Sequence, residues 1–145
     1  MKLHRNTALG IVSGLEKTLF EKYQAAEVIK RLFKSNSRWG SKDRRTIARA
    51  FYDIIRQKRL LHALCGSERE EVNLWCLLGC WLVLNDFQIP KWIEFNKINV
   101  QKIRGKALVL VKDRRYKYSI PDWLDQMGVE AFGEITWEKE IASLN

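Results

Sequence analysis

The sequence predicts an all-α protein, a bundle of about five to eight helices around a central apolar helix at about residues 72–84. Apolar residues recur at helical spacing along most of the chain. Pro90 and Pro121 are the only prolines, and no long segment alternates polar and apolar residues as a strand would. The stretch LWCLLGCWLVL, residues 74–84, is apolar on every side, which is typical of a helix in the middle of a bundle.

The first half of the chain predicts four helices. Residues 6–23 and 24–36 have apolar residues three and four apart, with Asn6 near the first cap. The turn-rich stretch SNSRWGS separates them from a third helix, residues 41–64, which Ser41 caps and Gly66 closes. The fourth begins with Glu68, Glu70 and Glu71, where the helix dipole favours anions, and continues through the apolar stretch.

The second half predicts shorter elements. A short helix over 90–98 precedes residues 99–111, where ALVLV (107–111) leaves helix or strand open, with helix favoured. A basic connector follows, then a helix that starts at Pro121 and that Gly128 closes, and a last helix capped by Thr136. We expect residues 1–118 to form the bundle and residues 119–145 to form a C-terminal helical junction.

Charge is segregated along the chain. The net charge is +9, and residues 1–60 carry fifteen Lys or Arg against five Asp or Glu, whereas residues 119–145 carry one against six. Such a distribution favours a polyanionic partner. Three cysteines indicate a reducing compartment, and the apolar stretch is too short to cross a bilayer. These features predict a cytoplasmic protein without a membrane partner.

The third predicted helix carries a basic stripe. At about 100° per residue, five cations and one tyrosine fall within roughly 100° of one another, opposite the apolar face. The stripe consists of Lys42, Arg45, Arg49, Tyr52, Arg56 and Arg59. Exposed helix faces usually mix charges of both signs, but Asp53 is the only acid near this one, so phosphates are the favoured ligand. A plain solvated face or an acidic protein patch are the alternatives, and Arg44 is expected to lean inward to a carboxylate or a helix C-terminus.

A second basic patch lies in KDRRYKY, residues 112–118. Lys112, Arg114, Arg115 and Lys117 alternate with Tyr116 and Tyr118. Cations with interleaved aromatic rings are typical of surfaces that bind single-stranded or looped RNA. A soluble interdomain connector is an equal alternative.

No catalytic, cofactor-binding or metal-binding residue is expected. The chain lacks the G-x-G-x-x-G and Walker motifs that cradle phosphates. A zinc site can be drawn from His62, Cys65, Cys76 and Cys80, but without C-x-x-C spacing these cysteines are expected to be buried apolar residues. Trp75 and Trp81 are expected in the core, and the other tryptophans are expected to anchor helix ends.

The chain resembles a known family over nearly its whole length. The stretches GSKDRRTIARAFYDIIRQKR (40–59) and SIPDWL (119–124) are its most specific pieces, and residues 85–112 match weakly. The resemblance is to the N-terminal domain of the Sun/Fmu (RsmB-like) RNA cytosine-5 methyltransferases. It implies an RNA-binding helical bundle like the antitermination factor NusB. It further implies ribosomal RNA as the partner, and a C-terminal methyltransferase domain in cis that binds S-adenosylmethionine.

The family's catalytic cysteines have no counterpart in this chain. They lie in Pro-Cys and Thr-Cys-Pro contexts, whereas Lys91 follows Pro90 and Asp122 follows Pro121. The resemblance therefore implies a non-catalytic RNA-recognition domain of an rRNA (cytosine-5) methyltransferase, with no cofactor of its own. A protein-interaction module, either a NusB-like antitermination partner or an interdomain scaffold, is the alternative.

Overall fold

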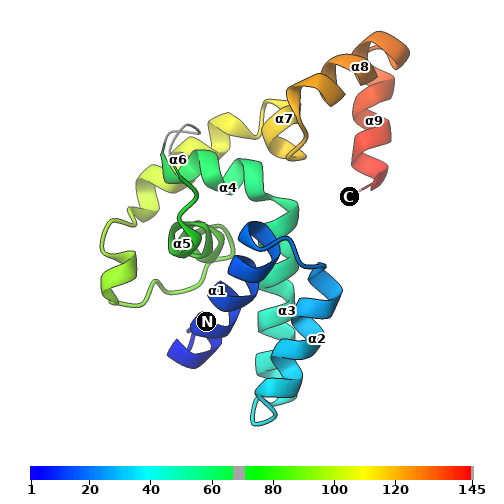
Figure 1. The fold of residues 1–145 in the computed structure, drawn as a ribbon. Coiled ribbons are helices and arrows are strands. Elements are labelled where there is room, and N and C mark those ends of the chain that lie inside the picture. The colour runs from blue at the N-terminus through cyan, green and yellow to red at the C-terminus, as the bar shows by residue number, and fades with distance from the viewer. Residues whose placement is uncertain (67–70, 145) are drawn as a thin grey trace.

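The chain is built of α-helices, as the sequence predicts (Figure 1). The computed structural model describes residues 1–66 and 71–144. In this part of the chain, the one β pairing is an isolated bridge between Lys2 and Gln88. The helices are α1 Arg5–Leu15, α2 Ala25–Ser35, α3 Ser41–Arg56, α4 Lys58–Cys65, α5 Leu74–Leu84, α6 Val100–Leu110, α7 Arg114–Lys117, α8 Asp122–Phe132 and α9 Glu134–Leu144, with a π-helical turn Glu16–Phe20 and a 3₁₀ turn Ile93–Phe95.

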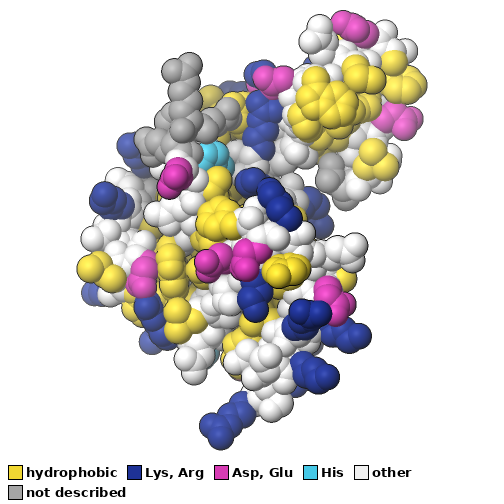
Figure 2. All heavy atoms as spheres, in the orientation of Figure 1, with side chains coloured by type: hydrophobic (Ala, Val, Ile, Leu, Met, Phe, Trp, Pro, Cys, Tyr) yellow, Lys and Arg dark blue, Asp and Glu magenta, His cyan; other side chains and the backbone are white. Residues whose placement is uncertain are grey.

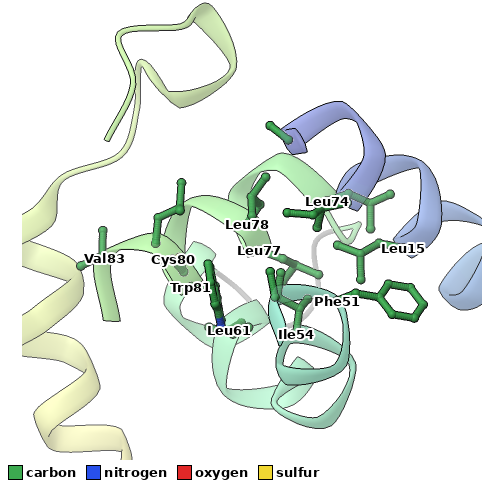
Figure 3. Close-up of a cluster of buried hydrophobic side chains, with 14 of the residues drawn as sticks. Leu15, Phe51, Ile54, Leu61, Leu74, Leu77, Leu78, Cys80, Trp81 and Val83 are labelled. Atoms are coloured by element: carbon green, nitrogen blue, oxygen red, sulfur yellow. The ribbon is translucent and has the colours of Figure 1, made fainter. Parts of the chain in front are cut away.

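The apolar helix α5 lies at the centre of the bundle, as predicted. It contacts α1, α3, α4, α6 and the 3₁₀ turn, so no side of it needs a polar face (Figure 1). Figure 3 shows how its side chains meet those of α1, α3 and α4. Trp81 is the largest fully buried side chain of this core.

The predicted third helix is divided at Gln57. This residue has φ −101° and ψ 19°, and α3 ends before it while α4 begins after it. No proline or glycine marks the division, so periodicity alone does not reveal it. The division adds one helix to those predicted, and α7 adds another where a connector was expected. The described part of the chain therefore has more helices than the predicted five to eight.

Several predicted helix ends are wrong by a few residues. His4 and Gly40 occupy the cap positions before α1 and α3, instead of Asn6 and Ser41. The helix α5 starts at Leu74 after Asn73, whose side chain accepts from the Cys76 N–H at 3.2 Å, so Glu71 precedes the helix. Glu68 and Glu70 lie outside the described residues. The ALVLV segment is the C-terminal half of α6, a helix as favoured.

Gly128 lies inside α8 and does not end it. A Cβ at this position would lie 2.1 Å from the Trp137 ring, so glycine allows α8 and α9 to approach closely. The helix instead ends at Gly133, which has φ +78°, a conformation that favours glycine. The last helix accordingly starts at Glu134 and not after a Thr136 cap.

The pair α8–α9 projects from the rest of the bundle (Figure 1). The two helices pack on each other, and α8 contacts α7. Trp137 and Ile141 are buried in this pair, which therefore has a small core of its own. The domain boundary expected near residue 118 stays a prediction. Across the described residues, none of the helices is both long enough and apolar enough to cross a membrane.

Candidate nucleic-acid interface

The first half of α3 presents cations to solvent, as the helical wheel predicts. Ile47, Phe51 and Ile54 are fully buried on one side of α3, while Lys42 and Arg45 are exposed on the other. Neither cation forms an ion pair with the part of the chain that the structure describes. Tyr52 is 39% exposed and meets the Phe51 ring edge-on at 5.2 Å. These three side chains are available to a ligand.

Arg49 and Arg56 also reach the surface, but each has partners in the fold. The Arg49 Nη2 donates to Asn85 Oδ1 at 2.8 Å, and its guanidinium lies 5.7 Å from the centroid of the Trp81 ring. Arg56 pairs with the Asp53 carboxylate, whose second oxygen accepts from Trp81 Nε1 at 3.1 Å. The two arginine side chains are still 60% and 54% exposed, so they can contact a ligand while they keep these partners.

Arg59 does not belong to the stripe. It lies on α4, beyond the division at Gln57, where the wheel of a single helix no longer applies. Its guanidinium donates to the Ile120 carbonyl and pairs with Asp122 at 2.7 Å, and it lies 4.8 Å from the Tyr116 ring centroid. Arg59 therefore joins α4 to the segment that leads into α8.

The second basic patch is occupied by acids of the same chain. Arg114 donates to both oxygens of Asp125 at 3.0 and 3.3 Å, and Arg115 pairs with Asp113 at 2.6 Å and Asp122 at 3.2 Å. Lys117 lies 3.8 Å from Glu138. Lys112 is exposed and makes no ion pair with the described residues. This geometry favours the connector alternative for most of the patch.

The aromatic rings of the patch are engaged by cations of the chain itself. The Tyr116 ring faces the guanidinium of Arg115 at 5.9 Å as well as that of Arg59. The Lys117 Nζ lies 5.2 Å from the Tyr118 ring centroid. Base stacking on either ring would compete with these contacts.

The ion pairs of Arg59, Arg114 and Arg115 with three aspartates form a joint between the bundle and α8. The aspartates are Asp113, Asp122 and Asp125. Hydrogen bonds from Arg115, Arg59 and Arg114 lower the pKa values of Asp113, Asp122 and Asp125, respectively, from the ordinary 3.8. Because each pKa is lower in the folded state, the stabilisation is complete above the ordinary pKa and is lost as the pH falls through the lowered one. The joint between α7 and α8–α9 should therefore loosen in acid.

We expect that loosening at pH values below the ordinary aspartate pKa of 3.8, and it can be followed at Trp137. The Trp137 Nε1–H donates to Asp125 at 2.9 Å, so its NMR resonance should move as the carboxylate is protonated. In an Arg114→Gln variant the same transition should occur at higher pH, closer to the ordinary aspartate pKa. A wild-type transition centred at the ordinary 3.8 would contradict the ion-pair assignment.

A further basic surface, not anticipated from the sequence, lies on α2 and the turn after it. Lys30, Arg31, Lys34 and Arg38 are all exposed. Figure 2 shows Lys and Arg side chains gathered over α2 and this turn. Of the four, Arg31 has an acidic neighbour, Glu27 at 3.5 Å. Two of these cations could have been found from the sequence, because Lys30 and Lys34 lie about 160° and about 120° from the buried Val28 on the helical wheel of α2.

The two surfaces meet where α2 turns into α3. Lys34 lies in the last turn of α2, Arg38 in the connection, and Lys42 and Arg45 in the first turns of α3. We call these four residues the hairpin tip. Asp43 is the acid nearest to them in sequence and is half-buried. The hairpin tip is therefore a group of exposed cations on either side of one turn of the chain.

Arg44 does not turn inward as expected. It is exposed, and its guanidinium lies over the Phe33 ring of α2 at 5.9 Å. We expected Arg44 to contact a carboxylate or a helix C-terminus. It contacts an aromatic ring instead, because α2 packs on this side of α3. Arg44 thus adds a cation beside the hairpin tip.

A polar cleft of about 950 Å³ opens beside the hairpin tip. The start of α1 forms one wall and the end of α2 with the following turn forms the other. Its polar lining includes Asn6, Ser13, Asn36 and Arg38, and Trp39 supplies an aromatic surface. Trp39 packs against α1 at Gly10, where a Cβ would lie 2.6 Å from the ring. The cleft offers hydrogen-bonding groups and a ring next to exposed cations.

The remaining tryptophans divide between core and surface. Trp81 is fully buried, and Trp75 is half-buried against Phe95. Trp92 is half-buried and Trp137 is buried, in agreement with anchoring roles. Trp123 is 63% exposed on α8, so it does not anchor a helix end.

The side chains best able to hold a metal ion lie apart from these basic surfaces. Cys65 at the end of α4 and Cys76 and Cys80 on α5 bring their sulfurs within 4.8 Å of one another. Hydrogen bonds from the Cys65 and Cys80 thiols lower the pKa of Cys76. Only Cys80 is fully buried, so the expectation of three buried apolar cysteines is wrong for Cys65 and Cys76.

Comparisons of the chain with protein-family models, with curated proteins and with solved structures find no match.

Proposed function

We propose that this chain is an RNA-recognition domain that binds phosphates through the hairpin tip and the outward face of α3. The observation that carries the proposal is the group of exposed cations at the tip, which no acid of the described residues neutralises. Surfaces of this kind bind nucleic acids by releasing counterions. The polar cleft with Trp39 would receive an unstacked nucleotide next to the bound phosphates.

The enzymatic setting of the proposal comes from the family resemblance of the sequence. In that setting the domain presents ribosomal RNA in the cytoplasm to a methyltransferase domain in cis. Transfer of the methyl group to cytosine and binding of S-adenosylmethionine would be tasks of that second domain. No residue of the present chain is given a catalytic role.

The geometry changes which predicted residues carry the function. Lys42, Arg45, Arg49, Tyr52 and Arg56 keep their predicted role, and Lys34 and Arg38 join them. Lys112 is the one cation of the second patch that no acid of the described residues engages. Arg59, Arg114, Arg115 and Lys117 hold the joint together, so they contribute to RNA binding mainly by positioning α8–α9.

Charge reversal at the hairpin tip should weaken RNA binding. In the double variant Lys42→Glu/Arg45→Glu we expect affinity for a structured RNA to fall on the order of ten- to a hundredfold at about 0.1 M salt. Both side chains are exposed and make no ion pair with the described residues, so the fold should be unaffected. Fluorescence anisotropy with a labelled RNA hairpin measures the affinity, and circular dichroism checks the helices.

A matched control separates local contacts from net charge. Lys91→Glu/Lys139→Glu changes the net charge equally, at exposed lysines outside the hairpin tip. We expect this variant to retain affinity within about threefold, since long-range charge is screened beyond about 10 Å at 0.1 M salt. Equal losses in both double variants would show nonspecific attraction and would remove the tip from the proposal.

A second candidate function, a protein-docking module, is favoured by one observation. The α8–α9 pair exposes a group of large apolar side chains, which Figure 2 shows together on this part of the surface. Among them are Trp123, Met127, Phe132 and Ile135. Apolar patches of this kind mark protein contacts. RNA affinity that is negligible in the wild type and unchanged in both double variants would favour this function over RNA recognition.

A further inference from the structure

Three cysteines that are distant in sequence meet where α4 packs against α5. Cys65 is the last residue of α4, and Cys76 and Cys80 are one turn apart on α5. Helices α4 and α5 are in close contact over their length, which brings the three sulfurs together. All three lie within 4.8 Å of one another, and the sulfurs of Cys65 and Cys80 are 3.8 Å apart.

This spacing matches that of thiolates around one metal ion. In a tetrahedral zinc site each Zn–S bond is about 2.3 Å long, which places neighbouring sulfurs about 3.8 Å apart. The Cys65–Cys80 separation already has this value, and the third sulfur needs a shift of at most about 1 Å. Thiolates are the ligands that soft and borderline metal ions prefer.

Two of the three cysteines are accessible to an ion from a cavity. Cys65 and Cys76 are half-buried and line a cavity of about 520 Å³, while Cys80 is buried behind them. His62 lines the same cavity and precedes Cys65 by three residues, about one helical turn, on α4. The ligand atoms that lie within 4.8 Å of one another are the three sulfurs without an atom of His62, so the imidazole would have to move toward them to complete a set of three sulfurs and one nitrogen.

A cation near the cluster would offset its charge. Three thiolates and one neutral imidazole around a divalent ion leave one net negative charge. Lys106 of α6 lines the cavity, and its Nζ donates to the carbonyl oxygens of Ala63 at 2.6 Å and Gly66 at 3.4 Å. The end of α4 thus holds an ammonium group beside the cysteines.

We propose that Cys65, Cys76 and Cys80, with His62 as the fourth ligand, form a zinc-binding site that joins α4 to α5. Binding of Zn²⁺ would release the thiol protons and would stabilise the folded chain, because the three cysteines converge only where α4 packs on α5. The site is separate from the hairpin tip, so it can be tested independently of RNA binding.

Cobalt is the spectroscopic probe for this site. The full chain, reduced and freed of metal, is titrated with Co²⁺ and then with Zn²⁺ in the presence of a non-thiol reductant. We expect one equivalent of Co²⁺ to give thiolate charge-transfer bands and the visible bands of tetrahedral cobalt, and Zn²⁺ to displace it. Zinc at a hundredfold excess over Kd should also raise Tm by about 5–10 °C.

Four variants locate the ligands. Cys76→Ser at the half-buried position and Cys80→Ala at the buried one should each weaken Co²⁺ binding and lower the intensity of the charge-transfer bands, because two thiolates remain of the three. His62→Gln should weaken zinc affinity by at least about tenfold, and His4→Gln, at the exposed histidine, should leave it unchanged. Circular dichroism checks that each variant is folded. If Cys80→Ala does not fold, Cys76→Ser still tests the site.

Two results would overturn the proposal. The first is wild-type chain that binds no stoichiometric Co²⁺ or Zn²⁺ while its three thiols are reduced. The second is a cobalt spectrum in folded Cys76→Ser that equals that of the wild type. Unchanged zinc affinity in His62→Gln would remove His62 from the ligand set.

Discussion

Replacing Trp81 with alanine should lower the free energy of unfolding by about 3–5 kcal/mol. Trp81 is fully buried in α5, and its ring lies 5.2 Å from that of Phe87. Its removal leaves a cavity at the centre of the bundle and removes the Nε1–H from which Asp53 accepts a hydrogen bond. Urea denaturation followed by circular dichroism measures the loss.

The size of this loss matters because small domains are stable by only about 5–15 kcal/mol. A Trp81→Phe variant retains a buried ring but loses the Nε1–H, so a smaller loss of about 1–3 kcal/mol is expected. Trp123→Ala, at an exposed tryptophan, is the matched control and should change stability by less than about 0.5 kcal/mol. A Trp81→Ala variant as stable as this control would contradict the assignment of α5 as the centre of the core.

Trp81 also connects the core to the proposed RNA surface. Its indole holds Asp53, which in turn pairs with Arg56, and its ring lies under the guanidinium of Arg49. Two cations of the α3 face are therefore positioned by a buried side chain. The core variant should for this reason weaken RNA binding even where the bundle remains folded.

Replacing Gly128 with valine should unfold α8–α9 and leave the bundle intact. The new Cβ would lie 2.1 Å from the Trp137 ring, against a helix surface that has no room to accept it. Trp137 would then lose both its burial and its hydrogen bond to Asp125. Because Trp137 and Ile141 are the buried residues of α9, little else holds the pair together.

Hydrogen exchange separates the two parts of the molecule. In Gly128→Val we expect amides of residues 122–144 to lose protection while those of α5 keep it. Gly105→Val is the matched control, since Gly105 lies within α6 and a Cβ there meets nothing within 4 Å. Equal protection of α8–α9 in the two variants would show that the close approach at Gly128 is not needed.

Periodicity identified the parts of the fold that burial dictates. The helix α5 was predicted because a segment apolar on all sides has one stable environment. The inward and outward faces of α3 followed from the same reasoning. The end of α3 could not be predicted, because nothing at Gln57 in the sequence indicates that the helix is divided there. The predicted stripe therefore included Arg59. Local chemistry also misled at Gly128, where a glycine needed for packing resembles one that ends a helix.

The ligands of charged and reactive side chains could not be predicted in the same way. Arg114 and Arg115 suggest a phosphate site until the fold brings Asp122 and Asp125 to them. The spacing of Cys76 and Cys80 on one helix face is visible in the sequence, but the approach of Cys65 depends on how α4 packs on α5. Pairings between distant segments require the tertiary structure.

The salt dependence of RNA binding tests the central claim most directly. The logarithm of the association constant should fall linearly with the logarithm of salt concentration, by about 0.7 per phosphate contact on single-stranded RNA. Loss of the contacts of Lys42 and Arg45 should make the slope of the Lys42→Glu/Arg45→Glu variant shallower than that of the wild type by about 1.4. The Lys91→Glu/Lys139→Glu control should retain the wild-type slope. Identical slopes for the wild type and the hairpin-tip variant would contradict RNA recognition by this surface.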